Sequence, residues 1–363
     1  MTSQEETPGA YLIRTEPEDF VVVEEPLYPT SGEGDHTFLY VEKRGRTTEQ
    51  VARELARMGR ISARDVGYAG RKDRHAVTRQ WFSLEGVDPE RALDFELYGA
   101  KVLEAHRHGH KLKTGHLRGN RFDITLRREG ESEIDSIQER ADEMVRRGMP
   151  NRYGDQRFGR EGDNAMQARK LLEGGPPPRD RRAARFLISA FQSEVFNAVL
   201  EERADAFDRV ELGDLARVEE SGGLFWVDDL DREQPRAKAF EISATGPIFG
   251  KKMRSPVGDV ARLEREVFDR FGLPAELANL SLPRGIRARG SRRPLRIRPE
   301  GLEVTPLAEG DGLRVQCGLP SGAYVTVLLE LLVGSVIDAN RVGRPSPDTA
   351  EGLDADAPSS GSG

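Results

Sequence analysis

The sequence predicts an α+β protein with about two domains. Segments with the two-residue period of strands alternate with segments that have the period of amphipathic helices. At 363 residues, the chain is longer than a single hydrophobic core usually serves. A segment rich in proline, glycine and charge, 173–182, predicts a domain boundary, and the composition of 344–363 predicts a disordered tail.

The first domain begins with two predicted strands and a helix. A β-branched run favours an extended segment at 11–25, and 36–43 favours a strand. Residues 47–59 predict a helix, because Thr47 and Gln50 have the spacing of a capping box. Later segments follow the same rules: a half-buried strand at 121–127, helices at 135–147, 183–203 and 257–271, weak strands at 224–227 and 240–242, and a strand followed by a helix within 313–332.

Composition predicts a soluble protein of the cytoplasm. No apolar run approaches the roughly 20 residues that a membrane span needs, and the N-terminus lacks the pattern of a signal peptide. The single cysteine, Cys317, fits a reducing compartment. The formal net charge of −7 means that any anionic polymer must be bound by local basic segments.

The segment 66–83 concentrates the chemistry. It places one carboxylate, Asp73, among the cations Arg71, Lys72, Arg74 and Arg79. Such a carboxylate stays ionised, which suits a nucleophile or a base. The same pattern also suits a loop aspartate that neutralises its basic neighbours, and the residues alone favour this second interpretation.

Five segments resemble one known family. Residues 66–83 contain G-x-A-G-x-K-D-R-x-A-x-T-x-Q-W-F, and 150–159 contain P-N-x-Y-G-x-Q-R-F-G. Both are similar to signatures of the TruD family of tRNA pseudouridine synthases, and weaker similarities lie at 17–24, 111–122 and 319–332. The resemblance implies that Asp73 is the catalytic carboxylate.

The resemblance also implies which side chains hold the target nucleotide. Asn151 and Tyr153 take family positions that contact it, although the family often has Phe where this chain has Tyr153. Phe20 and Tyr324 take positions of pocket aromatics, and for both we weigh the alternative of a core residue. We add Lys72 and Arg157 to the predicted substrate-binding set, since with Arg74 they are cations that could keep Asp73 ionised.

From the same resemblance we expect a pseudouridine-synthase-like catalytic domain with a mixed sheet and flanking helices. It would comprise 1–171 and 299–343, interrupted by an inserted α+β TRUD domain at 172–298, because the motifs return at the C-terminus. The implied reaction converts uridine to pseudouridine in tRNA, usually at position 13, and needs no cofactor. We expect the protein to be a monomer and to bind tRNA. A catalytically silent RNA-binding protein and a carboxylate-based hydrolase remain as alternatives.

Two basic segments are candidate phosphate contacts. The first comprises Lys111, Lys113, Arg118 and Arg121. The second is the arginine run 284–298, represented by Arg292, Arg293 and Arg296, with a solvated loop as the alternative. Four histidines, His106, His108, His110 and His116, lack the cysteine or acid that would complete a recognisable metal set, so we expect no metal site.

Overall fold

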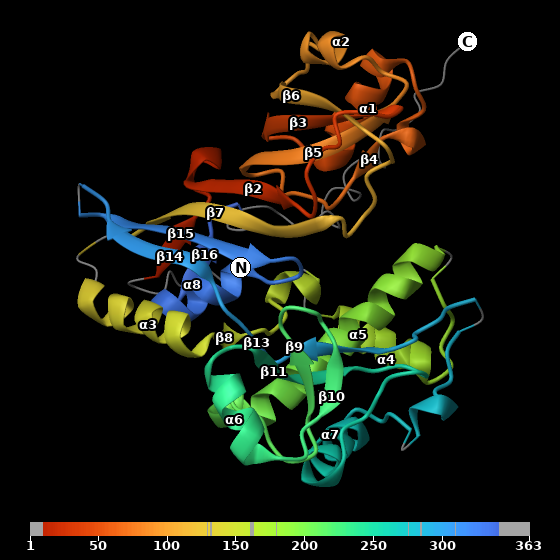
Figure 1. The fold of residues 1–363 in the computed structure, drawn as a ribbon, viewed down its shortest axis with the longest axis vertical. Helices are drawn as coiled ribbons and strands as arrows, with labels where there is room; N and C mark the ends of the chain where they lie inside the picture. Colours follow the sequence, from red (N-terminus) through yellow and green to blue (C-terminus); the bar gives the residue numbers. More distant parts are fainter. Residues whose placement is uncertain are drawn as a thin grey trace, which may run out of the picture.

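The larger of two main sheets takes its strands from both ends of the chain (Figure 1). The computed structural model describes residues 10–128, 130, 133–159, 163–178, 180–274, 276–283, 285–308 and 310–340. The strands of the larger sheet are β1 (Tyr11–Ile13), β2 (Phe20–Pro26), β3 (His36–Arg44), β4 (Gly67–Tyr68), β5 (Val77–Glu85), β6 (Ala100–His108), β7 (Leu117–Arg127), β14 (Glu300–Pro306), β15 (Gly312–Pro320) and β16 (Val336–Asp338).

This sheet is mixed, as the sequence predicts. Its main path runs β14-β15-β7-β2-β5-β3-β6. The β2–β5 and β1–β16 pairs are parallel, whereas the other pairs are antiparallel. Four helices accompany it: α1 (Thr48–Gly59), α2 (Pro89–Leu93), α3 (Ile134–Arg147) and α8 (Val325–Val333). We call this sheet and these helices the first lobe.

Local sequence explains why α1 starts where it does. Thr47 accepts a hydrogen bond from the Gln50 amide, and the Gln50 side chain accepts one from the Thr47 amide, so the predicted capping box is confirmed. The apolar stripe of α1, including Val51 and Leu55, is buried against β3, β5 and β6. Helices α3 and α8 pack on a second core with β1, β2, β7 and β15.

The second lobe lies below the first in Figure 1 and has its own sheet. Its strands run in the order β10 (Leu224–Trp226), β9 (Leu215–Val218), β11 (Ile242–Ile248) and β12 (Ser291–Pro294). Its helices are α4 (Asn164–Leu172), α5 (Arg181–Glu202), α6 (Leu230–Lys238) and α7 (Gly258–Arg270). A two-stranded pairing of β8 (Met149–Pro150) with β13 (Arg296–Ile297) brings the segments that connect the lobes together.

Short 3-10 helices complete the described structure: η1 (Pro17–Asp19), η2 (Ala63–Asp65), η3 (Asp155–Arg157), η4 (Ala204–Ala206) and η5 (Leu277–Asn279). Helix α4 shares a core with α5 and α7, so it packs in the second lobe although the predicted boundary after residue 171 would divide it from that lobe. The predicted tail, 344–363, lies outside the described residues. None of the described helices is long and apolar enough to cross a membrane.

Candidate active site

Asp73 lies in the loop between β4 and β5, with its side chain 54% exposed. One oxygen, Oδ2, accepts a hydrogen bond from Arg14 Nη2 at 2.8 Å. The neighbouring Ala76 is fully buried and anchors the loop in the core of the first lobe. The carboxylate is therefore both held in place and open to solvent, as a group that reacts with an external substrate must be.

Arg14 is the cation that sequence reasoning missed. Its side chain is only 6% exposed, and its second terminal nitrogen donates to Asp338 at 2.7 Å. Its guanidinium carbon lies 3.8 Å from the centroid of the Phe20 ring. Asn340 donates to the main-chain oxygen of Arg14, which has a left-handed φ of 59°. Pairing of β1 with β16 thus brings Asp338, from the far end of the sequence, to Arg14, which also binds Asp73.

This arrangement corrects two predictions. Phe20 is a core residue whose ring is covered by Arg14, so it supports the site without lining an open pocket. Lys72 points away from Asp73 and donates to Glu24 Oε2 at 2.6 Å, in a pair whose two side chains are buried. Because the Lys72 ammonium is committed to the buried Glu24 carboxylate, it does not pair with the Asp73 carboxylate beside it in the sequence.

A different lysine holds the loop from beneath. Lys43 on β3 is buried, and its ammonium donates to the main-chain oxygens of Asp73 at 2.8 Å and Arg46 at 2.7 Å. Burial lowers the pKa of Lys43 to about 8, against a smaller opposing effect of the Asp73 charge. The Lys43 ammonium thus lies beside the main chain of Asp73, held by main-chain oxygens and not by a carboxylate contact.

The second signature loop carries an aromatic pair. The rings of Tyr153 and Tyr324 meet edge to face, with centroids 5.8 Å apart. The guanidinium carbon of Arg293 lies 4.1 Å from the Tyr153 centroid, on a ring that also contacts Phe196. Burial raises the pKa of Tyr324. The structure therefore brings together two predicted pocket residues that are far apart in the sequence, and both remain partly exposed.

Asn151 is buried, and both polar atoms of its side chain form hydrogen bonds within the protein, while its contact with the nucleotide stays a prediction. Its side-chain nitrogen donates to the Pro294 oxygen at 3.0 Å, and its side-chain oxygen accepts from Arg293. Arg293 also donates to the oxygen of Gly322 at 2.9 Å. Asn151 and Arg293 therefore join the second lobe to the loop that precedes Tyr324.

Arg157 is hydrogen-bonded to side chains of helix α5. It donates to Ser193 Oγ at 3.2 Å and to Ser189 Oγ, and its guanidinium carbon lies 5.3 Å from the Phe186 centroid. The prediction that Arg157 is a charged neighbour of Asp73 is therefore wrong in this structure, where the Asp73 carboxylate pairs with Arg14.

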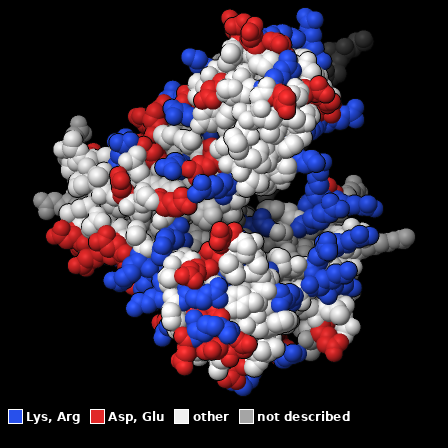
Figure 2. All heavy atoms as spheres, viewed as in Figure 1, with Lys and Arg blue, Asp and Glu red and all other residues white. Residues whose placement is uncertain are grey.

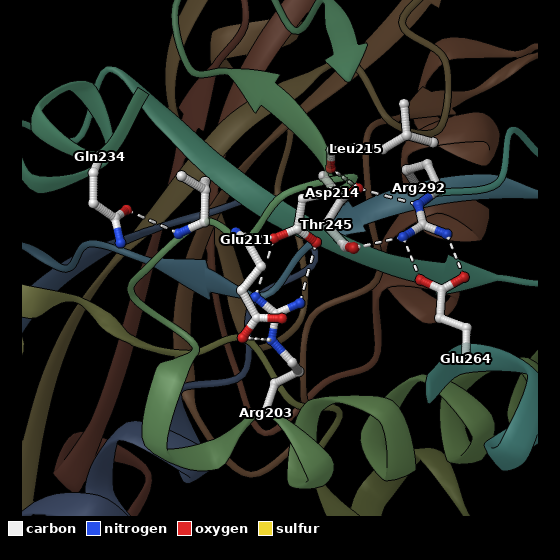
Figure 3. A network of polar contacts seen from close by, with 9 residues as sticks. Arg203, Glu211, Asp214, Leu215, Gln234, Thr245, Glu264 and Arg292 are labelled. Atoms are coloured by element: carbon white, nitrogen blue, oxygen red, sulfur yellow. Dashed lines mark hydrogen bonds and ion pairs between the residues drawn. The ribbon is translucent and has the colours of Figure 1, made fainter. Parts of the chain in front are cut away.

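Two arginines of the run 284–298, which was predicted to contact phosphates, instead stabilise the interior of the protein. Arg292 and Glu264 form an ion pair with side chains 1% and 3% exposed, next to the buried Arg203–Asp214 pair (Figure 3). Arg296 is buried, donates to main-chain oxygens including that of Arg147, and has its pKa lowered to about 10 by burial. Neither can reach a phosphate without unfolding its surroundings. Arg293 donates hydrogen bonds to Asn151 and to the Gly322 oxygen, so its prediction as a phosphate contact is corrected as well. Arg284 lies outside the described residues.

The first basic segment is at the surface. Lys113, Arg118 and Arg121 are exposed, and Lys111 is half-buried with its ammonium donating to the Arg64 oxygen. Arg121 pairs with Glu25 at 2.7 Å and Arg118 with Glu300 at 3.4 Å. These side chains remain predicted RNA contacts, because exposed pairs of this kind exchange partners at little cost.

The histidines form a cluster with Tyr28. His108 Nε2 and His110 Nε2 lie 3.3 Å apart, and the Tyr28 hydroxyl lies 2.7 Å from His116 Nδ1. His106 instead contacts Glu104. Within the described ranges, no group of three or more histidine, cysteine or acidic side chains has the arrangement of a metal site.

The fold matches that of a solved protein. A solved structure of a TruD protein from Methanosarcina mazei superposes with a TM-score of 0.73, covering 92% of this chain and 95% of that one. Since the two sequences are 21% identical, this likeness concerns the fold alone.

Sequence comparisons define the family. The model described as tRNA pseudouridine synthase D (TruD) matches residues 1–176 and 180–331. Proteins named tRNA pseudouridine synthase D are 38% identical in Geobacter sp. (strain M21), over 91% of this chain and 98% of that protein, and 41% identical in a strain of Thermus thermophilus, over 94% of each. Another, from Anaeromyxobacter sp. (strain Fw109-5), is 43% identical over 90% and 94%. The chain belongs to the TruD family.

Proposed function

We propose that this protein converts uridine to pseudouridine in tRNA, with Asp73 as the catalytic carboxylate. The family supports the reaction. The observation that supports the residue is the contact between an accessible Asp73 carboxylate and the buried, doubly anchored Arg14. The reaction breaks the bond between the ribose C1′ and N1 of uracil, turns the base and joins C1′ to C5. The hydrogen on C5 leaves as a proton and N1 gains a proton, so the atoms balance without a cofactor.

In this scheme Arg14 holds the Asp73 carboxylate in position, and the carboxylate acts as a nucleophile or as a base. Asp338 and Phe20 fix the Arg14 guanidinium in place. The Asp73 carboxylate is therefore already oriented when the target base binds. Lys43 fixes the main chain of the same residue from the other side.

The target base must leave its stack before Asp73 can reach C1′. The partly exposed edge-to-face pair of Tyr153 and Tyr324 offers aromatic surface for a base in that state. Lys111, Lys113, Arg118 and Arg121 would contact phosphates of the surrounding RNA. We further propose uridine 13 as the target, a monomer as the working form and the cytoplasm as the compartment.

The proposal is tested by incubating the protein with an unmodified tRNA transcript and mapping pseudouridine by carbodiimide labelling. We expect one labelled position, at uridine 13. A protein that binds tRNA but leaves every uridine unchanged would instead be a silent RNA-binding member of the family.

A further inference from the structure

Five exposed arginines gather where α5 begins. Arg181, Arg182 and Arg185 lie in its first turns, and Arg287 and Arg289 lie on the loop before β12. The loop residues between and beside them, Ile286 and Ala288, are buried against Ala184 and Ile188 of α5. This packing fixes the loop arginines on the same part of the second lobe as the helix arginines.

Stability does not account for these arginines. Asp180 caps α5 by accepting a hydrogen bond from the Arg182 amide, but the first turn itself contains no acidic residue, and cations are disfavoured at a helix N-terminus, where the partial charge of the helix is positive. None of the five guanidinium groups forms an ion pair with another described residue. A concentration of cations that the local fold disfavours indicates a function, most simply the binding of an anion.

One face of α5 connects these arginines to the aromatic pair. Arg182, Phe186, Ser189, Ser193 and Asn197 recur at three- and four-residue spacing and so share a face. Asn197 is bonded to both main-chain groups of Tyr153, and the two serines hold Arg157 beside Phe186. From Asn197 to Arg182 this face is about 22 Å long.

Phe186 stands out on this face, because its aromatic side chain is 45% exposed. Its ring lies 5.3 Å from the guanidinium carbon of Arg157. An exposed aromatic ring among arginines is the arrangement that single-stranded nucleic acid binds, with a base stacked on the ring and phosphates on the cations. In Figure 2, Lys and Arg side chains gather along the right of the second lobe, where it faces the first.

We propose that this surface is an RNA track leading away from the active site. The α5 track comprises Arg157, Arg181, Arg182, Arg185, Phe186, Arg287 and Arg289. It holds an unpaired stretch of the RNA substrate next to the target uridine, with one base stacked on Phe186. The inference rests on the proposed function for the identity of the polymer, and it replaces the buried arginines of β12 and β13 as the second RNA contact.

The test is the triple variant Arg181→Ala/Arg182→Ala/Arg185→Ala, measured for binding to a tRNA transcript over a range of salt. Each lost phosphate contact should lower the logarithmic salt slope by about 0.7–0.9, hence by about 2 or more for three. The KM for tRNA should rise in parallel. The control Arg209→Ala/Arg232→Ala/Arg262→Ala removes three exposed charges elsewhere in the same lobe and should leave the slope unchanged.

Phe186 supplies a test that is independent of charge. Phe186→Ala should weaken tRNA binding at least about fivefold, whereas Phe186→Tyr should restore it, because stacking needs only an aromatic face. The variants must melt at the parent's temperature. Unchanged affinity and salt slope in the triple variant, or equal binding by the Ala and Tyr variants, would overturn the track. If the parent forms no pseudouridine while the variants still lose tRNA binding, the proposed function fails and the track stands.

Discussion

Arg14 decides the geometry of Asp73. The two residues are 59 positions apart in the sequence and meet at 2.8 Å, and the pairing of β1 with β16 brings Asp338 to the same arginine. The planar guanidinium spans Asp73 and Asp338 at once, with its face on Phe20. Lysine, with a single ammonium group, cannot reproduce this bridge.

We therefore expect Arg14→Lys to lower kcat by about tenfold or more, since a hydrogen bond to a charged group contributes about 1.5–3 kcal/mol. Asp338→Asn should have a smaller effect, because it leaves the contact between Arg14 and Asp73 in place. Single-turnover assays at saturating tRNA would measure both. Equal rates for Arg14→Lys and the parent would show that the bridge has no part in the reaction.

Lys43 predicts a pH dependence. The protonated ammonium donates to the main-chain oxygens of Asp73 and Arg46, and its pKa is lowered to about 8. Activity should therefore fall as the pH rises through about 8, where the amine loses its charge and a donor. The charged groups that influence this lysine are Asp73, Lys72 and Glu49.

Stability should change in the opposite sense. Because the folded pKa is lower than the unfolded value of 10.5, the unfolded chain holds more protons between about pH 8 and 10.5, and the contribution of Lys43 to the free energy of unfolding rises across that range. We expect Lys43→Met to fold. Its rate of pseudouridine formation should be lower than that of the parent and should no longer fall as the pH rises through about 8. An unchanged pH–rate profile in Lys43→Met would rule out Lys43 as its origin.

At this scale the sequence indicates a candidate reactive residue, Asp73, but not the contacts that surround it. Asp73 follows from the charge pattern together with the family resemblance. Its partner does not, because no local spacing relates residue 14 to residues 73 and 338. Lys72 looked like the partner only because it is adjacent in sequence, whereas its side chain ends on Glu24.

At the scale of elements, the arginine run 284–298 shows what composition conceals. Its described residues pass from a loop into β12 and β13, so some arginines face solvent and others face the interior. Sequence reasoning treated the run as one surface, because arginines give no apolar period from which burial could be inferred. Helix α1 is the opposite case: its cap and its apolar stripe both follow local rules, and both are confirmed.

Burial of Arg292 makes a stability prediction. Arg292→Ala would leave Glu264 buried without its partner, in an environment where burial already raises the pKa of Glu264. We expect a loss of about 3–5 kcal/mol in the free energy of unfolding, measured by urea denaturation. Arg289→Ala, at an exposed position in the same run, is the matched control and should change it by less than about 0.5 kcal/mol. Equal stability of the two variants would contradict the assignment of Arg292 to the interior.

At the scale of the whole molecule, the two ends of the chain complete one site. The large sheet joins strands from 11–127 with strands from 300–338, as the prediction of a split catalytic domain requires, although its exact boundaries stay a prediction. Motif positions could indicate this arrangement. They could not indicate the contacts of Arg293 with Asn151 and Gly322, because these depend on how the two lobes pack.

The central claim is that Asp73 performs the chemistry and does not hold the RNA. The most direct test compares Asp73→Asn with the parent for two quantities: pseudouridine formed in a tRNA transcript, and affinity for that transcript at fixed salt. We predict no detectable product from Asp73→Asn. Its tRNA affinity should stay within about twofold of the parent, a difference of about 0.4 kcal/mol, because Asp73 does not hold the RNA. Product formation at a rate near that of the parent would contradict the account.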